Sequence, residues 1–212
     1  MSRARRLPAL LAVLVAVVLV ASACSDVGST GDLEYVAGDG PVVEVGAKDR
    51  GDVVDIAGKT VQGEALDLAD LRGQVVVLNV WWSGCGPCRT EMPMLVEAEK
   101  GYQENQPGQV SFVGINIRDL APENAAAFER DRGVDYPSLY DPGSDTLRAL
   151  GRYAPYAPPA TIVLDREGRV AALINGAIPS RTTLTTVVDD VLAEGGGGAP
   201  ASPSDSGSPA DG

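Results

Sequence analysis

The segment Trp82-Ser83-Gly84-Cys85-Gly86-Pro87-Cys88-Arg89 is the most informative part of the sequence. Before it, residues 75–81 are rich in β-branched side chains and predict a buried strand, and after it residues 90–102 have the composition of a helix. The two thiols therefore fall at a helix N-terminus, where free N–H groups and the helix dipole stabilise a thiolate. Their spacing lets the sulfurs meet within one helical turn. We interpret Cys85 and Cys88 as a redox-active disulfide pair.

Two other uses of a Cys-x-x-Cys pair are a structural disulfide and half of a zinc site. A disulfide that closes so short a loop removes little chain entropy and would stabilise the fold poorly. A zinc site would lack ligands, because the chain has no histidine and its third cysteine, Cys24, lies far away in the sequence. We expect no metal and no cofactor. The lack of histidine also excludes Ser-His-Asp and Cys-His catalysis.

The length and charge of the chain limit its organisation and its partners. Its 212 residues suffice for one ordinary domain with tails. The net charge of −12 argues against nucleic acid as a partner.

The N-terminus has the pattern of a secretory signal. Residues 1–23 consist of a basic stretch, an apolar run of about 14 residues and a few small residues. The apolar run is short for a membrane span, which needs roughly 20 residues, although an uncleaved anchor is the alternative. Small residues directly before Cys24 resemble a bacterial lipobox, which predicts lipidation of Cys24 at the extracytoplasmic face of the cell membrane.

The remaining composition divides the chain into a tether, a domain and a tail. Residues 24–50 are rich in Gly, Asp and Val without clear periodicity, and we expect them to form a flexible tether. Residues 195–212 are almost entirely small or polar, which predicts a disordered tail. The globular domain is then expected at residues 51–194.

Strands and helices alternate within this domain. We expect a hairpin at residues 53–62, turned at Gly58, and a second buried strand at 110–117. Two helices are expected at 122–131 and 145–150. An antiparallel strand pair within 161–174 and a closing helix at 180–193 follow. This order predicts an α/β three-layer sandwich, with a central mixed sheet flanked by helices and an N-terminal β-hairpin extension.

Residues 51–193 closely resemble the thioredoxin fold, in the TlpA/ResA-like branch of thiol-disulfide oxidoreductases. The residues that carry the resemblance are the strand ending at Trp81, then Cys85-Gly86-Pro87-Cys88-Arg89, Glu91 and Pro93, and later Pro159 before the strand Thr161-Ile162-Val163-Leu164. The resemblance implies a cis-proline at Pro159 that faces the cysteine pair. The Gly86-Pro87 pair resembles that of reducing thioredoxins, and it would tune the reduction potential.

The expected roles of the two cysteines follow from their order. Cys85 is nearest the helix dipole and the surface, so its thiolate would attack a substrate disulfide, and Cys88 would resolve the mixed disulfide. Asn79 occupies the position at which thioredoxins have a buried aspartate that accepts a proton. Because asparagine cannot accept a proton, Glu91 is the candidate acceptor, with a pKa raised by partial burial. The alternative is that Glu91 merely favours the first turns of a helix.

The sequence departs from the family at Gly84, where relatives usually have a tryptophan directly before the first cysteine. The aromatic neighbour of the thiol is then missing, unless Trp82 supplies it. Trp81, on the buried strand, is expected in the core.

These observations predict a lipid-anchored thiol-disulfide oxidoreductase. Its expected partners are exported cysteine-containing proteins and a membrane electron donor, and the resemblance implies work such as preparing apocytochrome c for haem attachment. One alternative is a thiol peroxidase, although peroxidatic families have a threonine where this chain has Trp82. Another is a redox-inert or Cu(I)-binding module, although copper carriers of this fold generally use a distant histidine.

Overall fold

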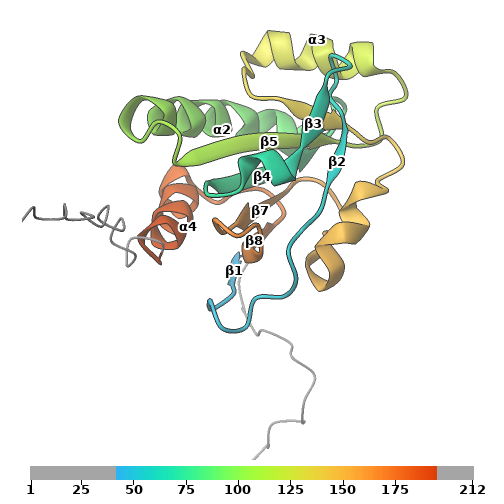
Figure 1. Ribbon diagram of the computed structural model, residues 1–212. Helices are drawn as coiled ribbons and strands as arrows, with labels where there is room; N and C mark the ends of the chain where they lie inside the picture. Colours follow the sequence, from blue (N-terminus) through green and yellow to red (C-terminus); the bar gives the residue numbers. More distant parts are fainter. Residues whose placement is uncertain (1–41, 195–212) are drawn as a thin grey trace, which may run out of the picture. The chain divides into compact units, whose positions relative to one another are not determined.

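The computed structural model describes residues 42–194, which form a mixed sheet with helices on both faces (Figure 1). The sheet has the strand order β1-β8-β7-β4-β5-β6. Its strands are β1 (Val42–Glu44), β4 (Val75–Trp81), β5 (Val110–Asn116), β6 (Ser138–Tyr140), β7 (Ala160–Leu164) and β8 (Val170–Asn175). The three longer helices are α2 (Gly86–Asn105), α3 (Pro122–Arg132) and α4 (Arg181–Glu194), and the shorter ones are η2 (Leu68–Leu71) and η3 (Thr146–Tyr153).

Strand β4 is the centre of the fold. It pairs in parallel with β5 and antiparallel with β7, and all seven of its residues are buried. Because side chains alternate along a strand, Val75, Val77 and Trp81 join the hydrophobic core under α2 and α4. Val76, Leu78 and Val80 join a second core on the opposite face of the sheet. The three-layer α/β sandwich predicted from the sequence is thus confirmed.

The N-terminal hairpin is present, but its strands differ from those predicted. Strand β2 (Ala57–Lys59) pairs antiparallel with β3 (Ala65–Asp67). Gly58 lies opposite Leu66 inside the hairpin rather than at its turn. The turn follows instead at Gly63, whose φ of +88° suits glycine.

The folded region also begins earlier than predicted, so the assignment of residues 42–50 to a tether is wrong. Strand β1 forms an edge of the sheet, with Val42 opposite Ile174 on β8, and Val45 is buried in the core. A three-residue strand carries too little periodicity to be recognised in the sequence.

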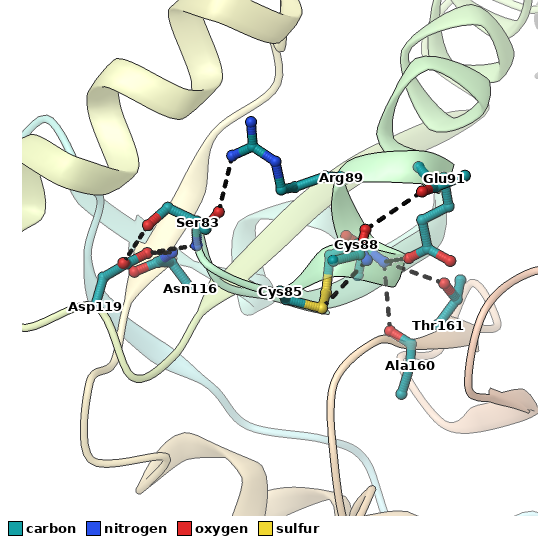
Figure 2. Close-up of a disulfide and its surroundings, with 12 residues drawn as sticks. Ser83, Cys85, Cys88, Arg89, Glu91, Asn116, Asp119, Ala160 and Thr161 are labelled. Atoms are coloured by element: carbon teal, nitrogen blue, oxygen red, sulfur yellow. Dashed lines mark hydrogen bonds between the residues drawn. A yellow bond between two sulfur atoms is a disulfide. The ribbon is translucent and has the colours of Figure 1, made fainter.

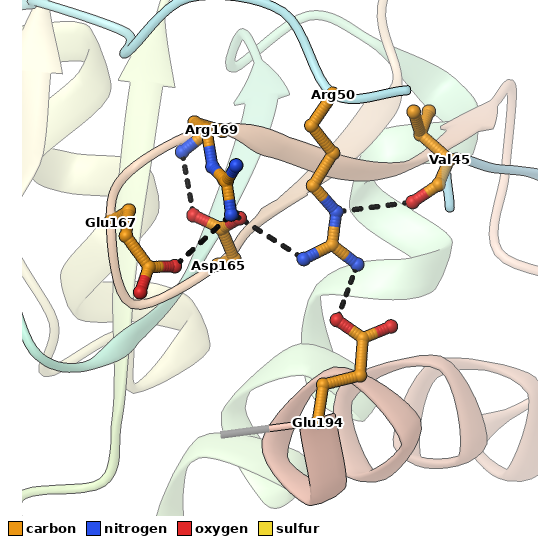
Figure 3. Close-up of polar contacts among 6 residues, drawn as sticks. All are labelled: Val45, Arg50, Asp165, Glu167, Arg169 and Glu194. Atoms are coloured by element: carbon orange, nitrogen blue, oxygen red, sulfur yellow. Dashed lines mark hydrogen bonds and ion pairs between the residues drawn. The ribbon is translucent and has the colours of Figure 1, made fainter. Parts of the chain in front are cut away.

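Arg50 fixes this N-terminal segment to the domain (Figure 3). Its guanidinium lies 3.0 Å from an Asp165 oxygen and 2.5 Å from a Glu194 oxygen, and it donates to the carbonyl of Val45. Arg169 approaches the same Asp165 carboxylate at 2.9 Å. The side chains of Arg50 and Asp165 are only 3% and 4% exposed, so a buried charge network holds three distant segments together.

Several sequence predictions lie outside the described residues. They are the signal peptide at residues 1–23, the lipidated Cys24, the tether up to residue 41 and the tail at residues 195–212. Within residues 42–194, no helix is long and apolar enough to cross a membrane.

Candidate active site

The two cysteines form a disulfide at the start of α2 (Figure 2). Cys85 is the N-cap residue of this helix, and its sulfur accepts a hydrogen bond from the backbone N–H of Cys88 at 3.2 Å. Cys85 retains 5% exposure, whereas Cys88 is fully buried. Gly86 and Pro87, the first two residues of the helix, are exposed. Only Cys85 can therefore be approached from solvent, at the end of α2 where the helix dipole favours a thiolate.

Glu91 lies in the interior one turn after Cys88, with 2% exposure. One carboxylate oxygen accepts a hydrogen bond from the Asn79 side chain at 3.0 Å, and the other accepts one from the backbone N–H of Ile178 at 3.0 Å. Burial raises the pKa of Glu91, and these two hydrogen bonds offset part of that rise. The carboxyl is more deeply buried than the sequence indicated, and the direction of its pKa shift is the one expected of a proton acceptor.

Asn79 links Glu91 to strand β7. Its side-chain amide also donates to the Thr161 hydroxyl at 3.3 Å and to the Ala160 carbonyl at 3.5 Å. Asn79 faces Thr161 across the β4–β7 pairing, so the sheet register itself sets this contact. The side-chain oxygen of Asn79 is buried without a hydrogen-bond partner. Asn79 therefore positions the Glu91 carboxyl group through the N–H groups of its side-chain amide, and its side-chain oxygen takes no part.

The peptide bond between Pro158 and Pro159 is cis, as the resemblance to the thioredoxin fold implied. Pro159 is buried and directly precedes β7, whose first two residues lie opposite Val80 and Asn79. The cis-proline is therefore close to Asn79, at the end of the sheet where β7 begins.

The two tryptophans occupy different environments. Trp81 is fully buried, stacks on Phe128 with 5.0 Å between ring centroids, and donates its indole N–H to Ser138 at 3.3 Å. This confirms its place in the core. Trp82 is half-buried against the core that contains both cysteines.

A polar cluster beside the disulfide was missed in the sequence (Figure 2). The buried carboxylate of Asp119 accepts hydrogen bonds from the Ser83 N–H at 2.9 Å, the Ser83 hydroxyl at 2.5 Å and the Asn116 amide at 2.8 Å. Arg89 donates to the Ser83 carbonyl at 3.1 Å. The loop before Cys85 is therefore fixed from both sides. The available signal was Asn116 at the carboxyl end of β5, because parallel neighbours such as β4 and β5 end at the same edge of the sheet.

The site brings together two cysteines and a buried carboxyl group. Among residues 42–194, no group of three or more His, Cys, Asp or Glu residues is arranged to hold a metal ion. What the arrangement can carry out is disulfide exchange, with a solvent-facing sulfur, a buried sulfur and a buried acid in sequence along one helix.

The comparisons with known proteins agree with this chemistry. The Redoxin family model matches residues 48–191. The chain is similar to a DsbF homologue from Corynebacterium diphtheriae (33% identity, TM-score 0.66, covering 76% of this chain and 99% of that one). It is also similar to a secreted thiol-disulfide isomerase from Corynebacterium glutamicum (31% identity, TM-score 0.68, covering 77% and 99%).

Among the curated relatives is the thiol-disulfide oxidoreductase ResA of Bacillus subtilis, which is 29% identical over 118 residues. This match covers 55% of the chain and 61% of ResA, so the chain spans less than two thirds of that relative. The chain belongs to the Redoxin family, in its TlpA/ResA-like branch of thioredoxin-fold thiol-disulfide oxidoreductases.

Proposed function

We propose that this protein exchanges disulfides with exported cysteine-containing proteins, acting as a reductase at the extracytoplasmic face of the cell membrane. The observation that carries the proposal is the disulfide between the slightly exposed Cys85 and the buried Cys88 at the N-terminus of α2. A sulfur in that position combines access to a partner with a stabilised thiolate.

The reaction begins from the reduced pair. The Cys85 thiolate attacks one sulfur of a substrate disulfide, so that a mixed disulfide forms and the other substrate sulfur leaves as a thiolate. Cys88 then attacks the Cys85 sulfur, which forms the Cys85–Cys88 bond and releases the second substrate thiolate. The substrate gains two electrons and the cysteine pair loses two.

In the second step, Glu91 accepts the proton of the Cys88 thiol. A buried thiol is a poor nucleophile until it is deprotonated, and a carboxyl whose pKa is raised by burial is better able to accept that proton. The hydrogen bonds from Asn79 and Ile178 hold the carboxylate in place and stabilise its charged form. Glu91 would then release this proton to solvent, and the cycle would be complete once a reductant supplied two electrons to the Cys85–Cys88 disulfide.

The cellular setting is part of the same proposal. Residues 1–23 would act as a lipoprotein signal, Cys24 would carry the lipid, the following residues would tether the domain, and residues 195–212 would form a tail. In this compartment disulfides persist, so a membrane electron donor must keep the pair reduced. Preparation of apocytochrome c cysteines for haem attachment is one task that such an enzyme would perform.

An insulin reduction assay tests the proposal. The wild-type domain should accelerate precipitation of the reduced insulin chains, and Cys85→Ser should abolish this activity. Cys88→Ser should instead accumulate a mixed disulfide, because the resolving sulfur is missing. Equal rates for wild type and Cys85→Ser would refute the proposal. Rapid hydroperoxide consumption, or tight Cu(I) binding without disulfide turnover, would favour the peroxidase or the copper module instead.

A further inference from the structure

The ring of Trp82 lies directly against the backbone of Gly84, next to Cys85. A Cβ atom placed on Gly84 would meet three atoms of the six-membered ring of Trp82 at 2.3, 2.6 and 3.0 Å. Real Cβ atoms do not approach other atoms this closely, so any side chain at position 84 would displace the indole. The glycine and the ring thus form one unit beside the reactive sulfur.

The loop that carries this unit is fixed. The N–H of Cys85 donates to the carbonyl of Trp82 at 3.1 Å, which closes a tight turn across Ser83 and Gly84. The Asp119 carboxylate accepts two hydrogen bonds from Ser83 within that turn. Trp82 also packs on the core that contains both cysteines. The indole is therefore ordered before a partner arrives, so that little conformational entropy is lost on contact.

Apart from the exposed Arg89, whose guanidinium donates to the Ser83 carbonyl, the residues beside Cys85 offer a partner few charged groups. Gly84, Gly86 and Pro87 are exposed and offer no charge, and the Ser83 hydroxyl is already bonded to Asp119. Among the described residues, the strongly exposed large apolar side chains are Val53, Leu120 and Tyr156. Leu120 directly follows Asp119, and Tyr156 lies in the loop that leads to Pro159.

We propose that Trp82 determines substrate specificity by contacting the polypeptide around the attacked cysteine, and that it favours cysteines flanked by apolar residues. The proposal rests on the function proposed above and adds the substrate class. A partly exposed indole gains free energy when apolar surface covers it, whereas a charged neighbour would lose hydration against the ring. Gly84 is required because it leaves room for the ring.

The test compares two disulfide-bonded peptides of equal length. In one peptide Leu and Val flank the attacked cysteine, and in the other Asp and Ser do. Hydroxyethyl disulfide, which has no flanking residues, measures the reactivity of the cysteine pair itself. The proteins are wild type, Trp82→Ala, Trp82→Phe and Gly84→Ala. Val53→Ser is the matched control, since it also alters an exposed apolar residue but lies in a bridge to Arg169, far along the chain from the cysteines.

Wild type should prefer the apolar peptide in kcat/KM, and Trp82→Ala should reduce this preference about tenfold, which corresponds to about 1.4 kcal/mol. Gly84→Ala should reduce it similarly by displacing the ring, Trp82→Phe should retain most of it, and Val53→Ser should leave it unchanged. If Trp82→Ala folds poorly, the test is whether Gly84→Ala loses the preference for the apolar peptide while Trp82→Phe retains it.

An unchanged preference in both Trp82→Ala and Gly84→Ala, or no preference in wild type, would overturn the inference while disulfide reduction itself continued. Failure of the wild-type protein with all three disulfides would instead overturn the proposed function.

Discussion

Two buried carboxyl groups, Glu91 and Asp165, lie toward opposite ends of strand β7 and have opposite surroundings. Asp165 receives two guanidinium groups, from Arg50 and Arg169 (Figure 3). Within residues 42–194, the Glu91 carboxyl group accepts hydrogen bonds only from the side-chain amide of Asn79 and the backbone N–H of Ile178. Its pKa is consequently raised by burial.

This difference in surroundings distinguishes a carboxylate with a structural role from a carboxyl group that can transfer a proton. A buried carboxylate that is paired with cations can tie segments together, as Asp165 ties the N-terminal segment to the β7–β8 turn. A buried carboxyl without a cation can change its protonation state near neutral pH, which a proton acceptor requires. Substitutions at the two positions should therefore affect different measurements.

The largest expected effect is on stability, at the Asp165 network. Arg50→Met should lower the free energy of unfolding by about 3–5 kcal/mol, because it removes a buried charge partner of Asp165. Urea unfolding measures this loss. Activity per folded molecule should remain that of wild type.

The exposed Arg148–Asp145 ion pair provides the control for Arg50→Met. Its side chains are 77% and 69% exposed, so Arg148→Met should cost less than about 0.5 kcal/mol. Equal costs for the two substitutions would show that the Arg50 network does not anchor the N-terminal segment.

The next effect is on turnover, at Glu91. Glu91→Gln should lower kcat/KM about 100-fold, or about 2–3 kcal/mol, because the amide cannot accept the proton of Cys88. Stopped-flow reduction of a peptide disulfide between pH 5 and 9 measures this, and the limb of the profile due to Glu91 should disappear. Glu97→Gln, on the exposed side of the same helix, is the matched control. A pH–rate profile unchanged by Glu91→Gln would contradict the role.

The same substitution should stabilise the fold at neutral pH. Because the pKa of Glu91 is raised in the folded state, its contribution to stability is fully present below its unfolded pKa and is lost as the pH rises through the folded value. Gln imitates the protonated form at every pH. The free energy of unfolding of Glu91→Gln should therefore exceed that of wild type at pH 8 and approach it at pH 4.

The smallest expected effect concerns Glu129, a second buried carboxyl whose pKa is raised by burial and only partly lowered by hydrogen bonds from Ser138 and Gln62. One of its carboxylate oxygens accepts a hydrogen bond from the Gln62 side chain at 2.7 Å. Glu129→Gln should raise Tm by ~2–4 °C at pH 8 and by less at pH 4, for the same reason as at Glu91. Turnover should not change. A loss of turnover equal to that of Glu91→Gln would remove the distinction between the two acids.

The sequence predicted the elements that carry strong local signals. The β-branched run of β4 and the helix after the cysteines are examples. The cis-proline before β7 was instead implied by the resemblance to the thioredoxin fold. The short strands β1 and β6 could not be recognised, because their existence depends on pairing with β8 and β5.

The candidate site divides in the same way. Cys85, Cys88 and Glu91 follow one another on one helix, so their spacing placed them together. Glu91 and Ile178 are separated by 87 positions in the sequence, and Ser83 and Asp119 by 36. Their contacts therefore result from tertiary packing. The position of the Trp82 ring depends on the same packing, so the sequence alone does not determine it.

The most direct test of the account is the rate at which each thiol of the reduced protein reacts with iodoacetamide as a function of pH, followed by peptide mass analysis. We predict that Cys85 is alkylated much faster than Cys88, with an apparent pKa below the ordinary value of about 8.5. Equally slow alkylation of both thiols at neutral pH would contradict the account, because no activated sulfur would then lie at the start of α2.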